Sequence, residues 1–213
     1  IQSVKINTLD LSVSYNTIGD TKPVGICGSG YISIISEMLS GKIIDKSGKI
    51  IALENKRIKN TDLGREFIVA FKEESDTIED IVITEADIEN IKRAKAAIYA
   101  ATAILIKHMD LEVSDIKKVF IAGGFGTSLD IESAIKIGLL PDLERKRFNF
   151  IGNSALSGAR QMLLSYQADK ESEEIARKIT YFDLSLDAKY MDEYMAALFF
   201  PHTNLQRFPS LKL

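Results

Sequence analysis

Apolar and polar residues follow one another along this chain in a way that predicts alternating strands and helices. Residues 1–24 alternate, as in Val4-Lys5-Ile6-Asn7, which predicts extended structure. Short apolar runs predict further strands at 49–53, 67–71, 81–83, 118–122, 148–151 and 179–184. Helical spacing predicts helices at 29–39, 85–109, 131–137, 154–166, 170–178 and 188–199. This order of elements indicates an α/β fold with a mixed sheet and flanking helices.

The longest predicted helix, 85–109, has the clearest pattern in the chain. Thr84 offers an N-cap hydroxyl, and carboxylates follow in the first turn. Its apolar stripe consists of Ile88, Ile91, Ala94, Ile98, Ala101 and Leu105. Many alanines would permit close packing on two sides, so we expect this helix to be central.

Composition limits the classes of function. The chain has 213 residues, 46% of them hydrophobic and few of them proline or glycine, which fits a packed domain. A net charge of −3 argues against a nucleic-acid partner, and no apolar run is long enough to span a membrane. We expect one domain over 1–213, with residues 42–83 as a possible β-rich insertion. The start at Ile1, which is not a methionine, indicates a fragment of a longer protein.

Metal chemistry has little support in the sequence. Cys27 is the only cysteine, whereas an iron–sulfur cluster is held by several cysteine thiolates. We expect Cys27 to be buried and inert, in an intracellular setting. His108 falls at a predicted helix end, where capping or exposure is expected, and His202 falls in an aromatic tail, where packing is expected.

Three glycine turns carry the strongest functional signal. Gly25-Ile26-Cys27-Gly28-Ser29-Gly30 opens a helix, Ala122-Gly123-Gly124-Phe125-Gly126 follows a strand, and Gly152-Asn153-Ser154 follows another. Glycine lets the backbone approach a ligand closely, and backbone N–H groups of such turns can bind phosphate or ribose oxygens. Ordinary strand–helix connections remain the alternative.

The turns occur in an order that resembles a known family. The first turn is followed by the helix 85–109, by Ala122–Gly126, by Ile137-Gly138-Leu139-Leu140-Pro141 and by Gly152–Ala159. This series, over roughly residues 20–202, is similar to the C-terminal part of the reductive activators of corrinoid proteins. The resemblance implies a fold of the ASKHA superfamily, which contains actin, sugar kinases and heat-shock chaperones.

The resemblance also implies a function for the parent protein. Such activators carry an N-terminal ferredoxin-like iron–sulfur domain and use ATP with Mg²⁺ to drive reduction of a Co(II) corrinoid to Co(I). The implied partner is a corrinoid protein or a corrinoid-dependent methyltransferase, in the cytoplasm, with a possible homodimer of the parent. No stretch here reads Asp-x-Gly-Thr-Thr or Asp-x-Gly-Gly, so both acidic phosphate loops of an ASKHA site are missing. The chain therefore resembles the second lobe alone, and we expect it neither to transfer electrons nor to hydrolyse ATP efficiently by itself.

The resemblance assigns roles to particular residues. Gly123, Gly124 and Gly126 match the adenosine motif, and Phe125 would flank the purine or lie in the core. Lys95, chosen from the basic group Lys92, Arg93 and Lys95, would contact adenine or ribose; a solvated basic patch is the alternative.

The first turn and the helix starts have simpler alternatives. Ser29, with Gly28 and Gly30, could donate to a phosphate, although a plain N-cap is favoured for Ser29. Asp130 and Asn153 are expected to cap the helices that follow them.

Two other functions fit the same residues. The lobe could be a docking module for the corrinoid protein without its own nucleotide binding, using the acidic surface and the apolar tail at Phe199-Phe200-Pro201. An ASKHA sugar or acyl kinase is a further possibility, against which the paired turns at 25–30 and 152–159 argue.

Overall fold

The computed structural model describes residues 1–124 and 128–211. Its strands form three small sheets: β1 (Ser3–Ile6) with β2 (Val13–Asn16), β3 (Ile58–Thr61) with β4 (Gly64–Ala70) and β5 (Ile81–Thr84), and β6 (Val119–Ala122) with β7 (Phe148–Gly152). The α-helices are α1 (Gly28–Ser40), α2 (Glu85–His108), α3 (Ile131–Lys136), α4 (Ser154–Leu164), α5 (Tyr166–Lys178) and α6 (Tyr190–Ala197).

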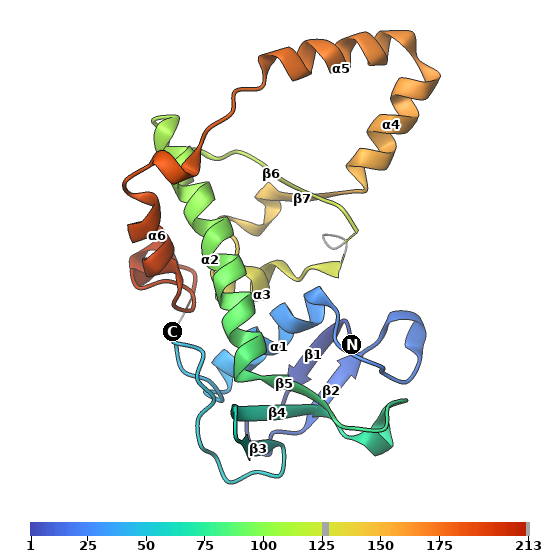
Figure 1. Cartoon of the computed structure of the whole chain (residues 1–213), viewed down its shortest axis with the longest axis vertical. Helices are drawn as coiled ribbons and strands as arrows, with labels where there is room; N and C mark the ends of the chain where they lie inside the picture. The colour runs from blue at the N-terminus through green and yellow to red at the C-terminus, as the bar shows by residue number, and fades with distance from the viewer. Residues whose placement is uncertain (125–127, 212–213) are drawn as a thin grey trace.

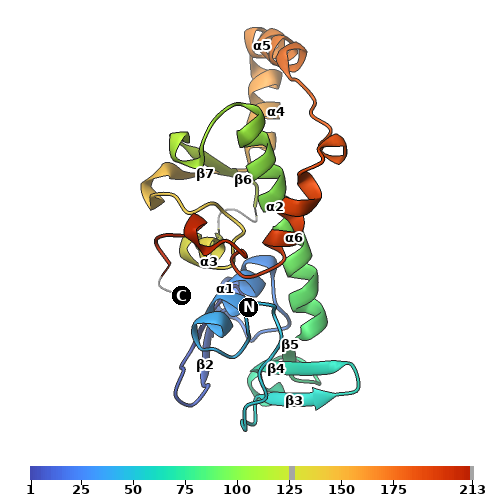
Figure 2. The ribbon, with the colours of Figure 1, turned by 90° about the vertical axis from the view of Figure 1, so that its left-hand side faces the viewer.

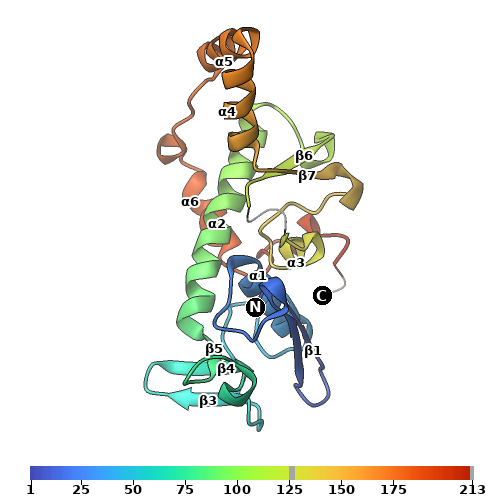
Figure 3. The same cartoon turned by 90° about the vertical axis from the view of Figure 1, so that its right-hand side faces the viewer.

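The long helix α2 connects the two ends of the molecule (Figure 1). Sheets β1–β2 and β3–β4–β5 lie at one end, and α4 and α5 project at the other, as Figures 2 and 3 show from the sides. The β6–β7 pair and α3 lie beside the middle and upper part of α2 (Figure 1). The first two sheets are antiparallel, whereas β6 and β7 run parallel and are connected through α3.

Two hydrophobic cores hold these elements together. The first packs α1 against β1, β4 and β5, with Ile35, Phe67 and Ile83 fully buried. The second packs α2, α3, β7 and α6 around Tyr99, Ile135 and Phe148. Burial of such large apolar side chains contributes roughly 1.5–3 kcal/mol each, so the cores dominate the stability of the chain.

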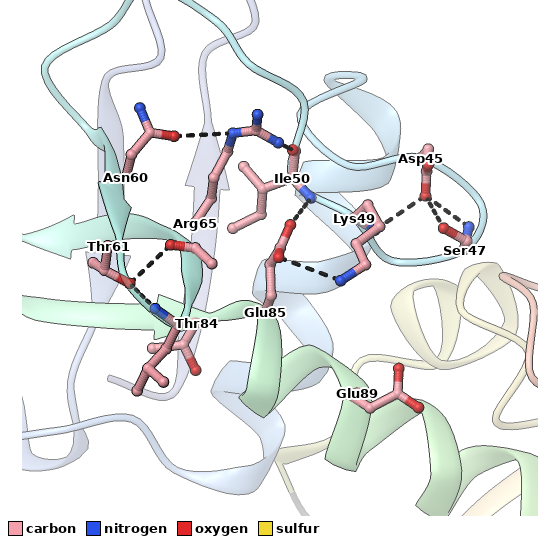
Figure 4. A network of polar contacts seen from close by, with 12 residues as sticks. Asp45, Ser47, Lys49, Ile50, Asn60, Thr61, Arg65, Thr84, Glu85 and Glu89 are labelled. Atoms are coloured by element: carbon pink, nitrogen blue, oxygen red, sulfur yellow. Dashed lines mark hydrogen bonds and ion pairs between the residues drawn. The ribbon is translucent and has the colours of Figure 1, made fainter.

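The start of α2 is fixed by a capping box and by contacts to a neighbouring loop. The Thr84 hydroxyl accepts from the amide of Asp87 at 3.1 Å, while the Asp87 carboxylate accepts from the amide of Thr84 at 3.0 Å. Glu85 then accepts from the amide of Ile50 at 3.0 Å, and Arg65 donates to the carbonyl of Ile50 at 2.8 Å (Figure 4). These bonds attach the 45–50 loop to both the helix and the β3–β4–β5 sheet.

The turn at residues 199–201, which follows α6, lies between the two cores. Phe200 is buried in the first core, and its amide donates to the carbonyl of Lys46 at 2.9 Å. Gly138 faces the carbonyl of Pro201 so closely that a Cβ there would overlap it. Phe208, a few residues further on, is buried in the second core, so the tail packs down as the sequence predicts.

Most helices and strands agree with the sequence patterns, including α2 with its Thr84 cap. The strand predicted at 49–53 is wrong, because only an isolated bridge between Ile44 and Ile50 forms there. The strand predicted at 179–184 is also wrong: Ile179 and Tyr181 are exposed, and a 3-10 helix follows at Leu184–Leu186. Strand β3 was missed because only Ile58 in it is apolar, and its pairing with β4 defines it.

Replacement of Gly138 with alanine tests the packing of the 199–201 turn. Gly138 has φ +76° and no room for a Cβ, whereas Gly19 has φ +75° and a Cβ there would meet no described heavy atom within 4 Å. We expect Gly19→Ala to cost about 1–2 kcal/mol of unfolding free energy from backbone strain alone. Gly138→Ala should cost about 1–3 kcal/mol more, from overlap with the Pro201 backbone. Urea unfolding of both variants measures this difference, and equal losses would contradict the packing argument.

Candidate functional site

The glycine turns after β6 and β7 are adjacent in the structure. The amide of Gly123 donates to the carbonyl of Gly152 at 2.7 Å, so the ends of the two parallel strands lie together. Gly123 has φ +96° and Gly152 has φ +65°, a region that L side chains rarely adopt. Parallel strands present their carboxyl ends at one edge, which is where ligands bind in open α/β sheets.

Among the described residues, no atom crowds the side-chain positions of these turns. A Cβ at Gly123, Gly124 or Gly152 would meet no described heavy atom within 4 Å. By contrast, a Cβ at Gly30 would collide with the carbonyl of Ile1. The backbone at 123–124 and 152 can therefore be approached by a ligand, whereas the absence of a side chain at Gly30 has a packing reason.

The first turn is more tightly built than the sequence suggests. Helix α1 begins at Gly28 with Cys27 as its N-cap residue, so the expected N-cap role of Ser29 is wrong. Ser29 lies one residue inside the helix, is buried, and donates from its hydroxyl to the carbonyl of Gln2 at 3.1 Å. The carbonyl of Gln2, which immediately precedes β1, accepts the hydrogen bond of the Ser29 hydroxyl that was expected to cap the helix.

Gln2 links the first turn to Ser128. Its carbonyl accepts from Ser29, and its side-chain amide donates to the hydroxyl of Ser128, close after the Gly123–Gly124 turn in the chain. Sequence reasoning missed Gln2, since a single glutamine before a strand gives no signal until the fold places it there. Gln2 thus joins the first turn to Ser128, and the bond from Gly123 to Gly152 joins the other two turns.

Cys27 is half-buried, so the prediction of a buried thiol is only partly correct. Its Sγ lies 3.2 Å from the hydroxyl of Ser29. Burial raises the pKa of the thiol, but hydrogen bonds from the Ser29 hydroxyl and from the amides of Gly30 and Ser29 outweigh it, and the net pKa is lowered.

Two predicted helix caps near the turns are confirmed. Asp130 accepts from the amide of Ser133 at 2.9 Å at the start of α3. Asn153 accepts from the amide of Leu156 at 3.0 Å at the start of α4. Phe125 and Gly126 of the predicted adenosine motif lie outside the described residues.

Lys95 lies apart from the glycine turns, in the interior. Its side chain is only 1% exposed, so the alternative of a solvated basic patch is wrong for this residue. The ammonium donates to the carbonyls of Phe199 at 2.6 Å and Pro201 at 2.7 Å, and it lies 5.3 Å from the centre of the Phe200 ring. Burial, with a smaller effect of the nearby Lys92 charge, lowers the pKa of Lys95 to about 7.

The other two cations of the basic group are paired on the surface of α2. Lys92 donates to the carbonyl of Ser47 at 2.9 Å and pairs with Glu89. Arg93 pairs with the same carboxylate at 3.1 Å. All three cations of this group are thus bound to carbonyl or carboxylate oxygens of the chain itself.

The two histidines lie in different surroundings. His108 is exposed, as expected, and lies 2.6 Å from the carboxylate of Asp187. His202 is buried against the ring of Tyr99 and hydrogen-bonds Glu193, so its predicted packing role is confirmed. Within 1–124 and 128–211, no three His, Cys, Asp or Glu side chains are grouped as a metal site would require.

Comparisons with known proteins match this arrangement over the whole chain. A family profile described as the C-terminal domain of RACo, the ASKHA domain, matches residues 1–212. A solved structure of a "Reductive activator for corrinoid,iron-sulfur protein" superposes with a TM-score of 0.94 and 49% identity, over 99% of this chain and 34% of that one.

Curated relatives give the same picture. The "Corrinoid activation enzyme RamQ" of Eubacterium limosum is 34% identical over 90% of this chain and 34% of its own length. The "[Co(II) methylated amine-specific corrinoid protein] reductase" of Methanosarcina barkeri is 32% identical over 74% of this chain and 25% of its own. The chain thus spans about a third or less of the relatives it matches.

Replacement of Lys95 with methionine tests the buried ammonium. An unfolded lysine has a pKa of about 10.4, so above pH of about 7 the unfolded chain binds more protons than the folded one. Stability contributed at this site should therefore rise with pH from about 7 to about 10, by up to about 1.4 kcal/mol per pH unit. We expect the unfolding free energy of the unsubstituted chain, minus that of Lys95→Met, to increase between about pH 6 and about pH 9.

The exposed Lys42→Met serves as the control and should show no such pH-dependent difference. Urea unfolding at several pH values measures both variants. A Lys95→Met difference that stays flat across this range would contradict the lowered pKa.

Proposed function

This chain belongs to the family of C-terminal ASKHA domains of RACo, and from that premise we propose that it is the nucleotide-binding lobe of a longer, ATP-dependent reductive activator of a corrinoid protein. The fold is that of an ASKHA domain, with mixed α/β structure. The relatives named above act on corrinoid proteins, one of them as a Co(II) corrinoid protein reductase.

The convergence of the open glycine turns carries this proposal. Gly123 and Gly152 are joined backbone to backbone, and Gln2 connects the Ser29 turn to Ser128, which follows Gly124 in the chain. Open backbone at a strand edge beside two helix starts is the kind of surface that accepts phosphate and ribose oxygens. Gly123 and Gly124 would face the nucleotide directly, whereas Gly28, Ser29 and Gly30 would hold the neighbouring helix start in place.

Lys95 keeps a different role in this proposal. Its ammonium is bonded to the Phe199–Pro201 turn, so it would stabilise the packing of that turn on α2 and would not reach adenine or ribose. Any effect of Lys95 on nucleotide affinity would then follow from stability of the tail.

A physical reason connects such a lobe to corrinoid reduction. Reduction of Co(II) to Co(I) is uphill for ordinary electron donors, and ATP with Mg²⁺ supplies the free energy when bound and hydrolysed. This chain's part would be to bind nucleotide better in one arrangement of the parent than in another, since a ligand shifts an equilibrium only through such a difference. The iron–sulfur cluster would be held by another part of the parent, a cytoplasmic protein that could act as a homodimer on a corrinoid protein or methyltransferase.

A docking role for the corrinoid protein is the second candidate. Helix α5 has no buried residue and projects at the far end of the molecule from the first two sheets (Figure 1). It carries the carboxylates Asp169, Glu171, Glu173 and Glu174. The apolar tail does not favour this role, because Phe200 and Pro201 are buried. No α-helix among the described residues is long and apolar enough to cross a membrane.

Calorimetric titration with ATP and Mg²⁺ tests the nucleotide site. Gly124→Val places a branched side chain on the open turn, and we expect it to weaken binding about tenfold or more, equivalent to at least ~1.4 kcal/mol. Leu63→Val, in the exposed β3–β4 turn, is the matched control and should leave affinity unchanged.

The titration is made on this chain and on a longer activator that carries it. Equal ATP affinity for Gly124→Val and the unsubstituted protein in both settings would rule out the Gly123–Gly124 turn as the nucleotide site. Loss of corrinoid-protein binding on removal of the α5 carboxylates, with ATP affinity retained, would favour docking as the role of that helix.

A further inference from the structure

A hollow of about 530 Å³ lies at the carboxyl end of α1. It is bordered by Ser40 of α1, by Lys136 of α3, by the segment 42–46 and by the turn at 200–201. Figure 2 shows α1 and α3 next to each other. Because a helix rises about 1.5 Å per residue, the two ends of α1 are about 18 Å apart. The hollow is thus separate from the glycine turn at 27–30.

The lining of the hollow is mainly apolar. Ile51 is 38% exposed in its wall, and Leu39 and Leu211 are half-buried there. Ile44 and Phe200 are almost fully buried and lie beneath these walls as part of the same lining. An apolar body placed in the hollow would therefore lose contact with water against apolar side chains.

The base of the hollow is held in place by hydrogen bonds. The amide of Phe200 donates to the carbonyl of Lys46 at 2.9 Å, which attaches the 200–201 turn to the segment 42–46. Lys95 donates to the carbonyls of Phe199 and Pro201, on either side of Phe200. The hollow is thus preformed, as small-molecule sites usually are.

Three lysines border this apolar lining. Lys42 and Lys46 are exposed, and neither ammonium has a hydrogen-bond or ion-pair partner within residues 1–124 and 128–211. Lys136 donates to the hydroxyl of Ser40 at 2.9 Å, which is a neutral partner. The ammonium groups of all three lysines therefore lack a carboxylate partner among the described residues.

Asp45 is the one carboxylate in the described lining, and its own turn already uses it. Its Oδ1 accepts from the amides of Ser47 at 2.8 Å and Lys49 at 3.0 Å and from the Ser47 hydroxyl at 2.6 Å (Figure 4). Three ammonium groups thus surround the hollow against one carboxylate, on a chain whose net charge is −3. This local excess of positive charge favours an anion.

From these features we propose that the hollow binds a small organic anion, in which a phosphate, sulfonate or carboxylate group is attached to an aromatic or aliphatic body. The lysines would bind the anionic group, since an ammonium is a compact charge with three donors. The apolar lining would bury the body. A volume of about 530 Å³ lies within the usual range of small-molecule sites, roughly 300–1,000 Å³. The proposal does not depend on nucleotide binding at the glycine turns.

Fluorescence titration with naphthyl phosphate tests this site, because the probe joins a phosphate to an aromatic body. Inorganic phosphate and naphthalenemethanol supply the two parts separately. The titrations are made on this chain and on a longer activator that carries it, and amide NMR of the chain locates the bound probe.

The test variant is Lys42→Gln with Lys46→Gln, which removes the two unpartnered ammonium groups. The matched control is Lys117→Gln with Lys118→Gln, which removes the same charge from exposed lysines before β6. Lys42→Arg with Lys46→Arg keeps the charge at the hollow.

We expect saturable binding of naphthyl phosphate to both proteins, with amide shifts at residues 42–46, 51 and 136. Its affinity should be about tenfold or more above that of either separate part, and the glutamine pair at the hollow should lower it about tenfold or more. The arginine pair and the matched control should retain the affinity, and ATP with Mg²⁺ should not displace the probe.

Three results would overturn the proposal. One is an affinity that the glutamine pair at the hollow leaves unchanged or that does not exceed that of inorganic phosphate. Another is displacement of the probe by ATP with Mg²⁺ together with its loss in Gly124→Val, which would place the probe at the glycine turns. The third is binding to the isolated chain that the longer activator lacks, which would show that the rest of the parent fills the hollow.

Discussion

The hydrogen bonds from the Lys95 ammonium to the carbonyls of Phe199 and Pro201 are the interaction on which the rest of the structure depends. They attach the 199–201 turn to α2 at the boundary between the two cores, where Phe200 lies in one core and Phe208 in the other. A buried charge is costly, and the two short bonds to carbonyl oxygens offset only part of that cost here, because burial still lowers the pKa of Lys95 to about 7. The 199–201 turn also packs on Gly138, just after α3. This contact holds the start of the segment that leads from α3 to β7.

The contacts among Lys95, the 199–201 turn and Gly138 position the glycine turns, although none of these residues belongs to those turns. Helix α3 connects β6 to β7, so its fixed position sets the ends of both strands. The bond from Gly123 to Gly152 brings two turns from different parts of the sequence together, and Gln2 joins the first turn to Ser128. Crowded glycines such as Gly30 and Gly138 serve packing, whereas a Cβ at Gly124 would meet no described heavy atom within 4 Å, so crowding by described residues does not explain that glycine.

The sequence predicted local features well and long-range ones poorly. The capping box at Thr84 and the caps at Asp130 and Asn153 depend on neighbouring residues, so the local sequence predicts them. The burial of Lys95 was not, because its partners lie more than a hundred residues further along the chain. The role of Gln2 depends on where α1 packs, and the failed strand at 179–184 shows that an apolar run needs a partner strand, which a local pattern cannot supply. The glycine turns were found as motifs, but only the fold shows which of them adjoin.

The central claim is that the adjoining turns at 123–124 and 152 face a nucleotide and that the turn at 27–30 supports them, and hydrogen exchange with and without ATP and Mg²⁺ tests it most directly. The account predicts slower exchange on ATP addition at residues 27–30, 119–124 and 149–156 together, with no change in the β3–β4–β5 sheet. Slowing at one turn alone, or confined to α5 or the β3–β4–β5 sheet, would contradict it.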